Sequence, residues 1–178
     1  MDNEQPAGPD LARQAAETAE LQPERVDPDL EPLGHDDVAA AVAAITASRK
    51  KLLALLDDAG PAALDRRPGS GEGRTIGRTL AHIAGTEIFV LNRLGLSEPS
   101  ERLPEQLPSV DPLPLLDDTR RRVLNEIGGL DESWLTRTVV AGDETWTLRK
   151  ALRRLQEHEA EHLADIRTIL SEGAERDE

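Results

Sequence analysis

The residues best suited to chemistry in this chain are histidines, because the sequence contains no cysteine. His158 and His162 are four positions apart, which places them one turn apart on the same face of a helix, with a rise of about 6 Å. Leu155, Ile166 and Ile169 fall on that same side, so both imidazoles should point toward the neighbouring helices. Two neutral imidazoles side by side suit a metal ion, and two polar residues at the rim of the core are the alternative.

His82 strengthens the metal interpretation. It lies in the middle of an expected helix, in a segment with few other polar residues (Thr79–Ala84), and a bundle can bring such a position opposite the last helix. Three histidines without a fourth protein ligand leave open coordination positions, as in catalytic zinc sites. His82, His158 and His162 are therefore suited to hold a divalent ion, with zinc or nickel preferred and iron also suited, and the residues alone give this interpretation and three structural histidines equal weight. Three structural histidines remain the alternative.

The segment from His158 to His162 also matches the H-E-x-x-H pattern of zinc peptidases, in which the glutamate is the general base. The third ligand of such enzymes lies well downstream, whereas only an acidic terminus follows His162, and no sheet precedes the helix to bind a peptide. We therefore interpret Glu159 as a solvated residue of an acid-rich helix. A metallopeptidase stays as a rival hypothesis.

Other candidates are less specific. Glu87 falls on the apolar side of its helix, where its carboxylate is a candidate catalytic base or a partner of a ligand histidine; pairing with an arginine is the commoner role. Asp165 is placed to orient an imidazole, although a solvated acid is commoner, and Thr86 is a candidate pocket residue. Trp146 is expected to anchor packing, and His35 to lie at the surface or in a helix cap.

Hydrophobic periodicity indicates an all-α fold that positions these residues. Amphipathic helices are expected at 38–56, 75–94, 115–127 and from Thr147 to about Leu170, and two short strands around a turn at 136–146. This pattern predicts a four-helix bundle of the up-and-down type, with a short β-hairpin before the last helix. The expected domains are a disordered acidic arm at 1–34, the bundle at 35–172 and a frayed tail at 173–178.

Composition excludes several classes of function. The formal net charge is −14, which disfavours binding to nucleic acid, and without cysteine there is no disulfide framework or thiolate nucleophile. No apolar run reaches the roughly 20 residues of a membrane span, and the N-terminal residues do not form a signal peptide. We therefore expect a soluble, cytoplasmic protein that does not bind membranes.

Two stretches together resemble the DinB/YfiT-like superfamily of metal-dependent hydrolases and thiol-dependent S-transferases. One is T-I-G-R-T-L-A-H-I-A-G-T-E at 75–87, and the other runs from E-T-W-T-L-R-K-A-L at 144–152 into E-H-E-A-E-H-L-A-D-I at 157–166. The likeness covers about residues 35–172. Each motif is short, but their order and spacing are fairly specific to this superfamily.

The resemblance implies a four-helix bundle, often a homodimer, with a divalent metal ion held by His82, His158 and His162. It also implies a small-molecule substrate, with a low-molecular-weight thiol as the attacking group in an S-transferase or water in a hydrolase. The sequence does not separate these two reactions. A non-catalytic bundle that binds metal or dimerises is the alternative from a different class, and the three aromatic residues of the chain slightly favour it.

Overall fold

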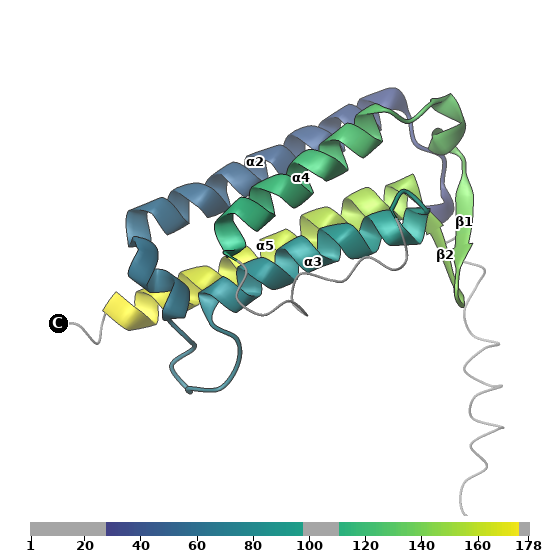
Figure 1. Cartoon of the computed structure of the whole chain (residues 1–178). Helices are drawn as coiled ribbons and strands as arrows, with labels where there is room; N and C mark the ends of the chain where they lie inside the picture. Colours follow the sequence, from purple (N-terminus) through teal and green to yellow (C-terminus); the bar gives the residue numbers. More distant parts are fainter. Residues whose placement is uncertain (1–27, 98–110, 175–178) are drawn as a thin grey trace, which may run out of the picture.

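The computed structural model describes residues 28–97 and 111–174, which form a helical bundle closed at one end by a β-hairpin (Figure 1). Four helices make up the bundle, and the strands pair before the last of them. The helices are α2 (His35–Ala59), α3 (Ile76–Leu94), α4 (Pro112–Gly128) and α5 (Leu148–Ala174), the strands are β1 (Thr138–Ala141) and β2 (Glu144–Thr147), and the short 3-10 helices are η1 (Pro28–Leu30), η2 (Pro61–Asp65) and η4 (Glu132–Leu135). The predicted four-helix bundle with a hairpin is therefore confirmed.

The helix ends follow from local sequence. The hydroxyl of Thr75 accepts a hydrogen bond from the Arg78 amide at the start of α3, and the Asp111 carboxylate accepts one from the Leu113 amide at the start of α4. Pro112 is the first residue of α4, where no amide is needed, so this helix begins three residues before the predicted Leu115. Gly95 ends α3 at φ 72°, a conformation that glycine adopts without strain.

The β-hairpin directly precedes α5 and supplies the residue that caps this helix. β1 and β2 are antiparallel, with Thr138 opposite Thr147 and Ala141 opposite Glu144, and Gly142 takes φ 72° in the turn. The hydroxyl of Thr147, the last strand residue, accepts a hydrogen bond from the Lys150 amide, as the predicted helix cap requires. The hairpin and the first turn of α5 are therefore joined directly.

The directions of the helices differ from the strict alternation of the predicted up-and-down type. Gly77 near the start of α3 lies against Pro112, the first residue of α4, so these neighbouring helices are parallel. An added Cβ at Gly77 would come within 3.3 Å of the Leu64 carbonyl oxygen, which explains the glycine at this close approach. α2 and α5 run in the opposite direction (Figure 1). Only short connections force neighbouring helices to alternate, and residues 95–111 are enough chain to cover the about 28 Å of a 19-residue helix.

Apolar residues form two clusters along the bundle axis. The cluster near the hairpin includes Ile45, Leu91, Val123 and Trp146, and the other is built around residues such as Leu52, Leu80, Leu116 and Ile166. Each cluster draws on all four helices, as expected when each helix buries one apolar stripe. All four helices are therefore held in register at both ends of the bundle.

Part of the predicted N-terminal arm packs against the bundle. Leu33 is buried in the hairpin-end cluster, and Asp29 is buried with its carboxylate hydrogen-bonded to the Arg153 guanidinium at 2.7 Å. Residues 28–34 therefore belong to the packed structure. The rest of the predicted arm, residues 1–27, and residues 175–178 of the predicted tail lie outside the described residues.

None of the helices in residues 28–97 and 111–174 combines the length and apolar character needed to cross a membrane.

Candidate metal centre

The three predicted ligands meet between α3 and α5. The Nε2 atom of His158 lies 3.2 Å from Nε2 of His82 and 3.2 Å from Nε2 of His162. The three imidazole rings are mutually edge-to-face, with centroids 4.5 to 5.2 Å apart. All three side chains are half-buried, and one ring nitrogen of each lies within 4.8 Å of those of the others. The structure thus brings together the residues that sequence spacing and the resemblance singled out.

Polar side chains in the described part of the chain contact the imidazoles of His162 and His158. Asp165, one turn after His162, places a carboxylate oxygen 3.2 Å from His162 Nδ1, and the Thr86 hydroxyl lies 3.2 Å from His158 Nε2. When Nδ1 of His162 carries the proton and donates it to Asp165, its Nε2 lone pair faces the other two rings. The Thr86 hydroxyl donates to the His82 carbonyl oxygen at 3.1 Å, which fixes its own position on α3.

The electrostatic surroundings keep His158 uncharged. Burial lowers the pKa of His158 to about 4, with the imidazoles of His162 and His82 and the guanidinium of Arg154 acting in the same direction. At pH 7 this imidazole is therefore neutral, and neutral imidazole is the form that ligates metals.

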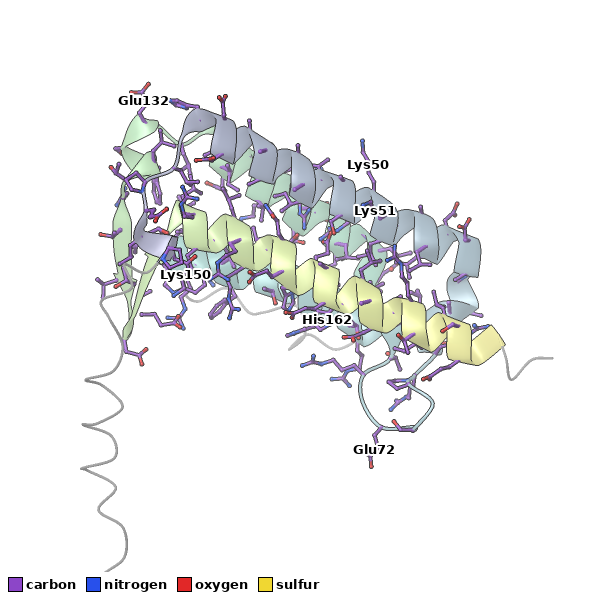
Figure 2. The ribbon with its side chains drawn as sticks, turned by 180° about the vertical axis from the view of Figure 1, so that it is seen from behind. Lys50, Lys51, Glu72, Glu132, Lys150 and His162 are labelled. Carbon is purple, nitrogen blue, oxygen red and sulfur yellow. The ribbon has the colours of Figure 1, made fainter. Side chains whose placement is uncertain are left out.

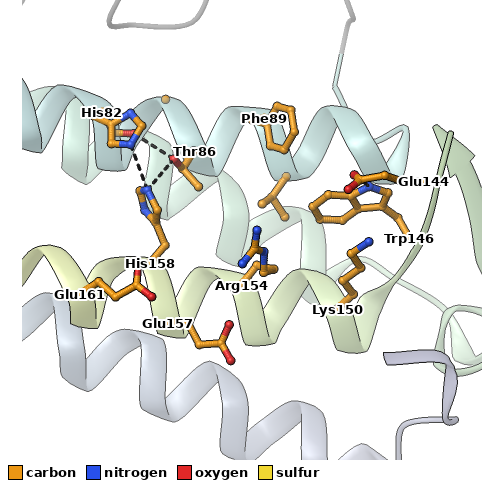
Figure 3. Close-up of a pocket in the computed structure, with 12 residues that line it drawn as sticks. His82, Thr86, Phe89, Glu144, Trp146, Lys150, Arg154, Glu157, His158 and Glu161 are labelled. Atoms are coloured by element: carbon orange, nitrogen blue, oxygen red, sulfur yellow. Dashed lines mark hydrogen bonds between the residues drawn. The ribbon is translucent and has the colours of Figure 1, made fainter. Parts of the chain in front are cut away.

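A cavity of about 420 Å³ opens beside the histidines and runs along the groove between α3 and α5 toward the hairpin (Figure 3). His82 and His158 line one end, and Trp146 lies at the other. Figure 2, which views the molecule from behind relative to Figure 1, places His162 midway along α5 and Lys150 nearer the hairpin. The remaining lining residues are Gly85, Thr86, Phe89, Val90, Glu144, Arg154, Glu157 and Glu161. The size suits a small molecule.

A second polar cluster lies inside the bundle, and each helix contributes one charged residue to it. We call Arg49, Glu87, Arg120 and Glu159 the charge cluster. Arg49 bonds both carboxylates, at 2.8 Å to Glu87 and 2.7 Å to Glu159, and Arg120 bonds the same two at 2.6 and 2.8 Å. The glutamate side chains are 1% exposed and the arginines 6–7%. Two positive and two negative charges thus neutralise one another in the core.

The expectation of a solvated Glu159 is wrong, because its side chain is buried and bonded by two arginines. The glutamate of the H-E-x-x-H match is thus held in the core by Arg49 and Arg120, and it is not a free general base beside the histidines. Glu87 takes the arginine-paired role that sequence analysis gave as its commoner alternative. Its other carboxylate oxygen accepts a hydrogen bond from the Thr119 hydroxyl.

The other expected residues divide between pocket and surface. Thr86 lines the cavity, and Trp146 is 3% exposed in the core while one side of it contributes to the cavity wall. Asp165 is 66% exposed yet contacts an imidazole, so it is both a surface acid and a histidine partner. His35 is 72% exposed and lies 3.7 Å from Glu132, as expected of a surface residue.

Sequence reasoning missed three functional or structural positions. Arg49, Arg120 and Arg154 were not singled out, although a signal existed for the first two. Each lies four residues after and seven before an apolar core residue: Ile45 and Leu56 flank Arg49, and Leu116 and Ile127 flank Arg120. A charge inside an apolar stripe indicates a buried ion pair. Nothing in the sequence marks Arg154, whose position in the cavity depends on how α3 and α5 pack.

Comparison with known families agrees with this architecture. The sequence model of the DinB superfamily matches residues 44–166, which is more than half of the chain and includes His82, His158 and His162. The fold is a helical bundle with a histidine cluster between two helices, and the chain belongs to the DinB superfamily. Neither the curated proteins nor the solved structures gave a significant match.

Proposed function

We propose that the protein binds one divalent metal ion through the Nε2 atoms of His82, His158 and His162 and uses it in a small-molecule reaction. The observation that carries the proposal is the convergence of these three atoms, with two Nε2 separations of 3.2 Å. Two imidazole nitrogens that each lie about 2.05 Å from a tetrahedral zinc ion are about 3.3 Å apart. These separations match the spacing of ligands around one ion, and they lie at the long end of the range for hydrogen bonds between imidazoles.

The reaction class that we propose is thiol-dependent S-transfer or hydrolysis. A divalent ion lowers the pKa of a bound water or thiol and polarises an electrophile. The chain supplies no cysteine, so a thiol nucleophile must come from a small molecule in the cavity. In this proposal the Asp165 carboxylate keeps the proton of His162 on Nδ1, and the Thr86 hydroxyl holds the imidazole of His158 in place. The walls of the cavity between α3 and α5 orient the substrate.

The cavity favours an enzyme over a non-catalytic metal-binding bundle. Of the three aromatic residues in the chain, Phe89 and Trp146 both line the cavity beside the histidines. Ligand pockets are typically lined by aromatic and apolar side chains with a few polar groups. The low number of aromatic residues, which favoured a non-catalytic bundle, is therefore less informative than their position in the cavity. The homodimer implied by the family resemblance remains a prediction, which light scattering on the purified protein tests.

Elemental analysis of wild type, His82→Ala and His35→Ala tests the metal proposal, after zinc or nickel loading and dialysis without chelator. We expect about one metal per chain in wild type and in His35→Ala, which removes an exposed histidine remote from the cluster. We expect little metal in His82→Ala, because two adjacent imidazoles on one helix hold an ion weakly. Equal metal content in wild type and His82→Ala would contradict the three-histidine centre, and no metal in either would contradict metal binding altogether.

Catalysis is tested separately on metal-loaded protein. Conjugation of a small thiol to an electrophile and hydrolysis of small esters and amides are measured in wild type and in His82→Ala. We expect turnover in one of the two assay classes that is lost in the variant. A stoichiometric metal ion without turnover in either class would support the non-catalytic alternative.

A further inference from the structure

Arg154 occupies a distinctive place in the cavity beside the histidines. It lies on α5 one turn before His158, and Figure 3 shows its guanidinium extending from α5 into the groove toward α3. Among the described residues, no hydrogen bond or ion pair engages this guanidinium. The preceding residue, Arg153, is by contrast bonded to Asp29 and to Glu157 at 2.6 Å. A guanidinium at a cavity wall has five donors to offer to a ligand.

Several other charged groups of the cavity already have partners, which leaves Arg154 available to bind a charged ligand group. Lys150 donates to the Thr145 carbonyl oxygen at 3.1 Å, and its ammonium lies 4.7 Å from the centre of the Trp146 ring. Two of the three acids that line the cavity are also engaged: Glu144 accepts from the Trp146 indole at 2.9 Å, and Glu157 pairs with Arg153. Because these neighbours are bonded to other groups, the Arg154 guanidinium is suited to bind a negatively charged ligand group.

The groups around Arg154 define what the ligand must be. Phe89 and Trp146 meet edge-to-face at 5.9 Å and, with Val90, supply the apolar part of the cavity wall, while the Arg93 guanidinium lies 4.7 Å from the centre of the Phe89 ring. A flat apolar group packs well against such a wall. One guanidinium matches one carboxylate through two parallel hydrogen bonds, and the three glutamates that also line the cavity disfavour a dianion.

We propose that Arg154 binds the carboxylate of a monoanionic substrate whose apolar or aromatic part lies against Phe89 and Trp146. This inference rests on the proposed function and names the substrate class for the same site. Because Arg154 and His158 are one helical turn apart, about 6 Å along α5, a carboxylate at Arg154 leaves the next few atoms of the substrate beside the imidazoles. Arg154 therefore determines which part of the substrate reaches the histidine cluster.

Calorimetric titration of the purified full-length chain with 3-phenylpropionate and with its neutral amide, 3-phenylpropionamide, tests the inference. We expect wild type to bind the acid about tenfold or more tightly than the amide, because only the acid offers a carboxylate to the guanidinium. Equal binding of acid and amide, or no binding of the acid at millimolar concentration, would overturn the inference.

Variants assign the effect to Arg154. Arg154→Ala should weaken acid binding about tenfold or more and leave amide binding unchanged, and Arg154→Lys should retain part of the preference for the acid. Arg167→Ala is the matched control: it removes the same charge from an exposed position on α5 that does not line this cavity. If Arg154→Ala binds the acid within twofold of wild type, or if Arg167→Ala loses as much, the inference is overturned.

The same titrations on metal-free and zinc-loaded protein separate this inference from the proposed function. If wild type takes up no metal but acid binding still depends on Arg154, the metal proposal fails and the carboxylate subsite stands. If acid binding depends on zinc and not on Arg154, the carboxylate ligates the ion, so the subsite is overturned and the metal proposal stands.

Discussion

The bundle contains two polar clusters that differ in how their groups are satisfied. In the charge cluster, two arginines and two glutamates from four helices neutralise one another, and their side chains are at most 7% exposed. In the histidine cluster, three imidazoles from two helices face one another beside a cavity, and their contacts within the described residues include one exposed carboxylate and one hydroxyl. Both clusters use α3 and α5, and Glu159 directly follows His158.

This difference indicates that the charge cluster stabilises the fold, whereas the histidine cluster is a candidate binding site. Breaking a buried ion pair leaves an uncompensated charge in the core, so the charge cluster favours the one packing in which all four helices meet correctly. Three half-buried imidazoles that converge beside a cavity contribute less to folding than a buried network of ion pairs, and such an arrangement is typical of residues kept for a ligand. By fixing the rotation of α3 and α5, the charge cluster also keeps His82 facing His158 and His162.

The largest expected effect comes from breaking the charge cluster. Glu159→Gln leaves Arg49 and Arg120 sharing a single carboxylate, that of Glu87, and we expect the free energy of unfolding to fall by about 3 kcal/mol. Urea denaturation measures this change. The folded fraction of the variant should still bind zinc, because Glu159 is not a ligand.

The matched control for this prediction is Glu161→Gln, which removes an exposed acid two residues further along α5. Its unfolding free energy should stay within about 0.5 kcal/mol of wild type. A Glu159→Gln protein that is as stable as wild type yet has lost peptide hydrolysis would instead support the metallopeptidase hypothesis.

A smaller effect is expected at the edge of the histidine cluster. Asp165→Asn replaces the carboxylate that lies 3.2 Å from His162 Nδ1, and we expect zinc affinity to fall about tenfold, because this partner orients the ring. Competition with a chromophoric chelator measures the affinity. Glu161→Gln is again the control, since it removes the same charge beside His162. An equal loss in both variants would mean that general electrostatics, and not the hydrogen bond, sets the affinity.

The smallest effect is expected where an ion pair is only partly buried. The guanidinium of Arg153 holds the pKa of Asp29 below its usual value of 3.8, although burial acts in the opposite direction. A carboxylate with a lowered pKa contributes stability above its unfolded-state pKa and loses it as the pH falls through the folded-state pKa. The Arg153 side chain is 43% exposed, so we expect a contribution of at most about 1 kcal/mol.

Urea denaturation of wild type and Asp29→Asn between about pH 2 and pH 7 measures this contribution. The variant should be less stable near neutral pH, and the two proteins should converge in acid, below the folded-state pKa of Asp29. A difference that persists unchanged at the lowest pH would show that Asp29 contributes through packing and not through its charge.

Much of this architecture was predictable from sequence because it follows from local rules. The spacing of His158 and His162 fixes their common face, and the caps at Thr75 and Thr147 fix where α3 and α5 begin. The position of His82 opposite them depends on tertiary packing, and the family resemblance supplied that information. These residues carry the candidate site, so its core was accessible before the structure.

The sequence-based prediction was wrong where the residue type alone suggested exposure to solvent. Glu159 was assigned to solvent because most helix acids are exposed, although it lies four residues after Leu155 and seven before Ile166, inside the apolar stripe. Its burial becomes favourable only because Arg49 and Arg120, far away in sequence, supply two positive charges. The parallel direction of α3 and α4 and the entry of Arg154 into the cavity likewise depend on long-range packing, which no local pattern encodes.

The central claim is that the histidine cluster is a metal centre and that the charge cluster is not. The most direct test is a crystal structure of the zinc-loaded protein with anomalous diffraction measured at the zinc absorption edge. Our account predicts one strong anomalous peak about 2.0–2.1 Å from Nε2 of His82, His158 and His162, and none beside Glu87 or Glu159. A peak bound to His158 and His162 without His82, or no peak between the three rings, would contradict it.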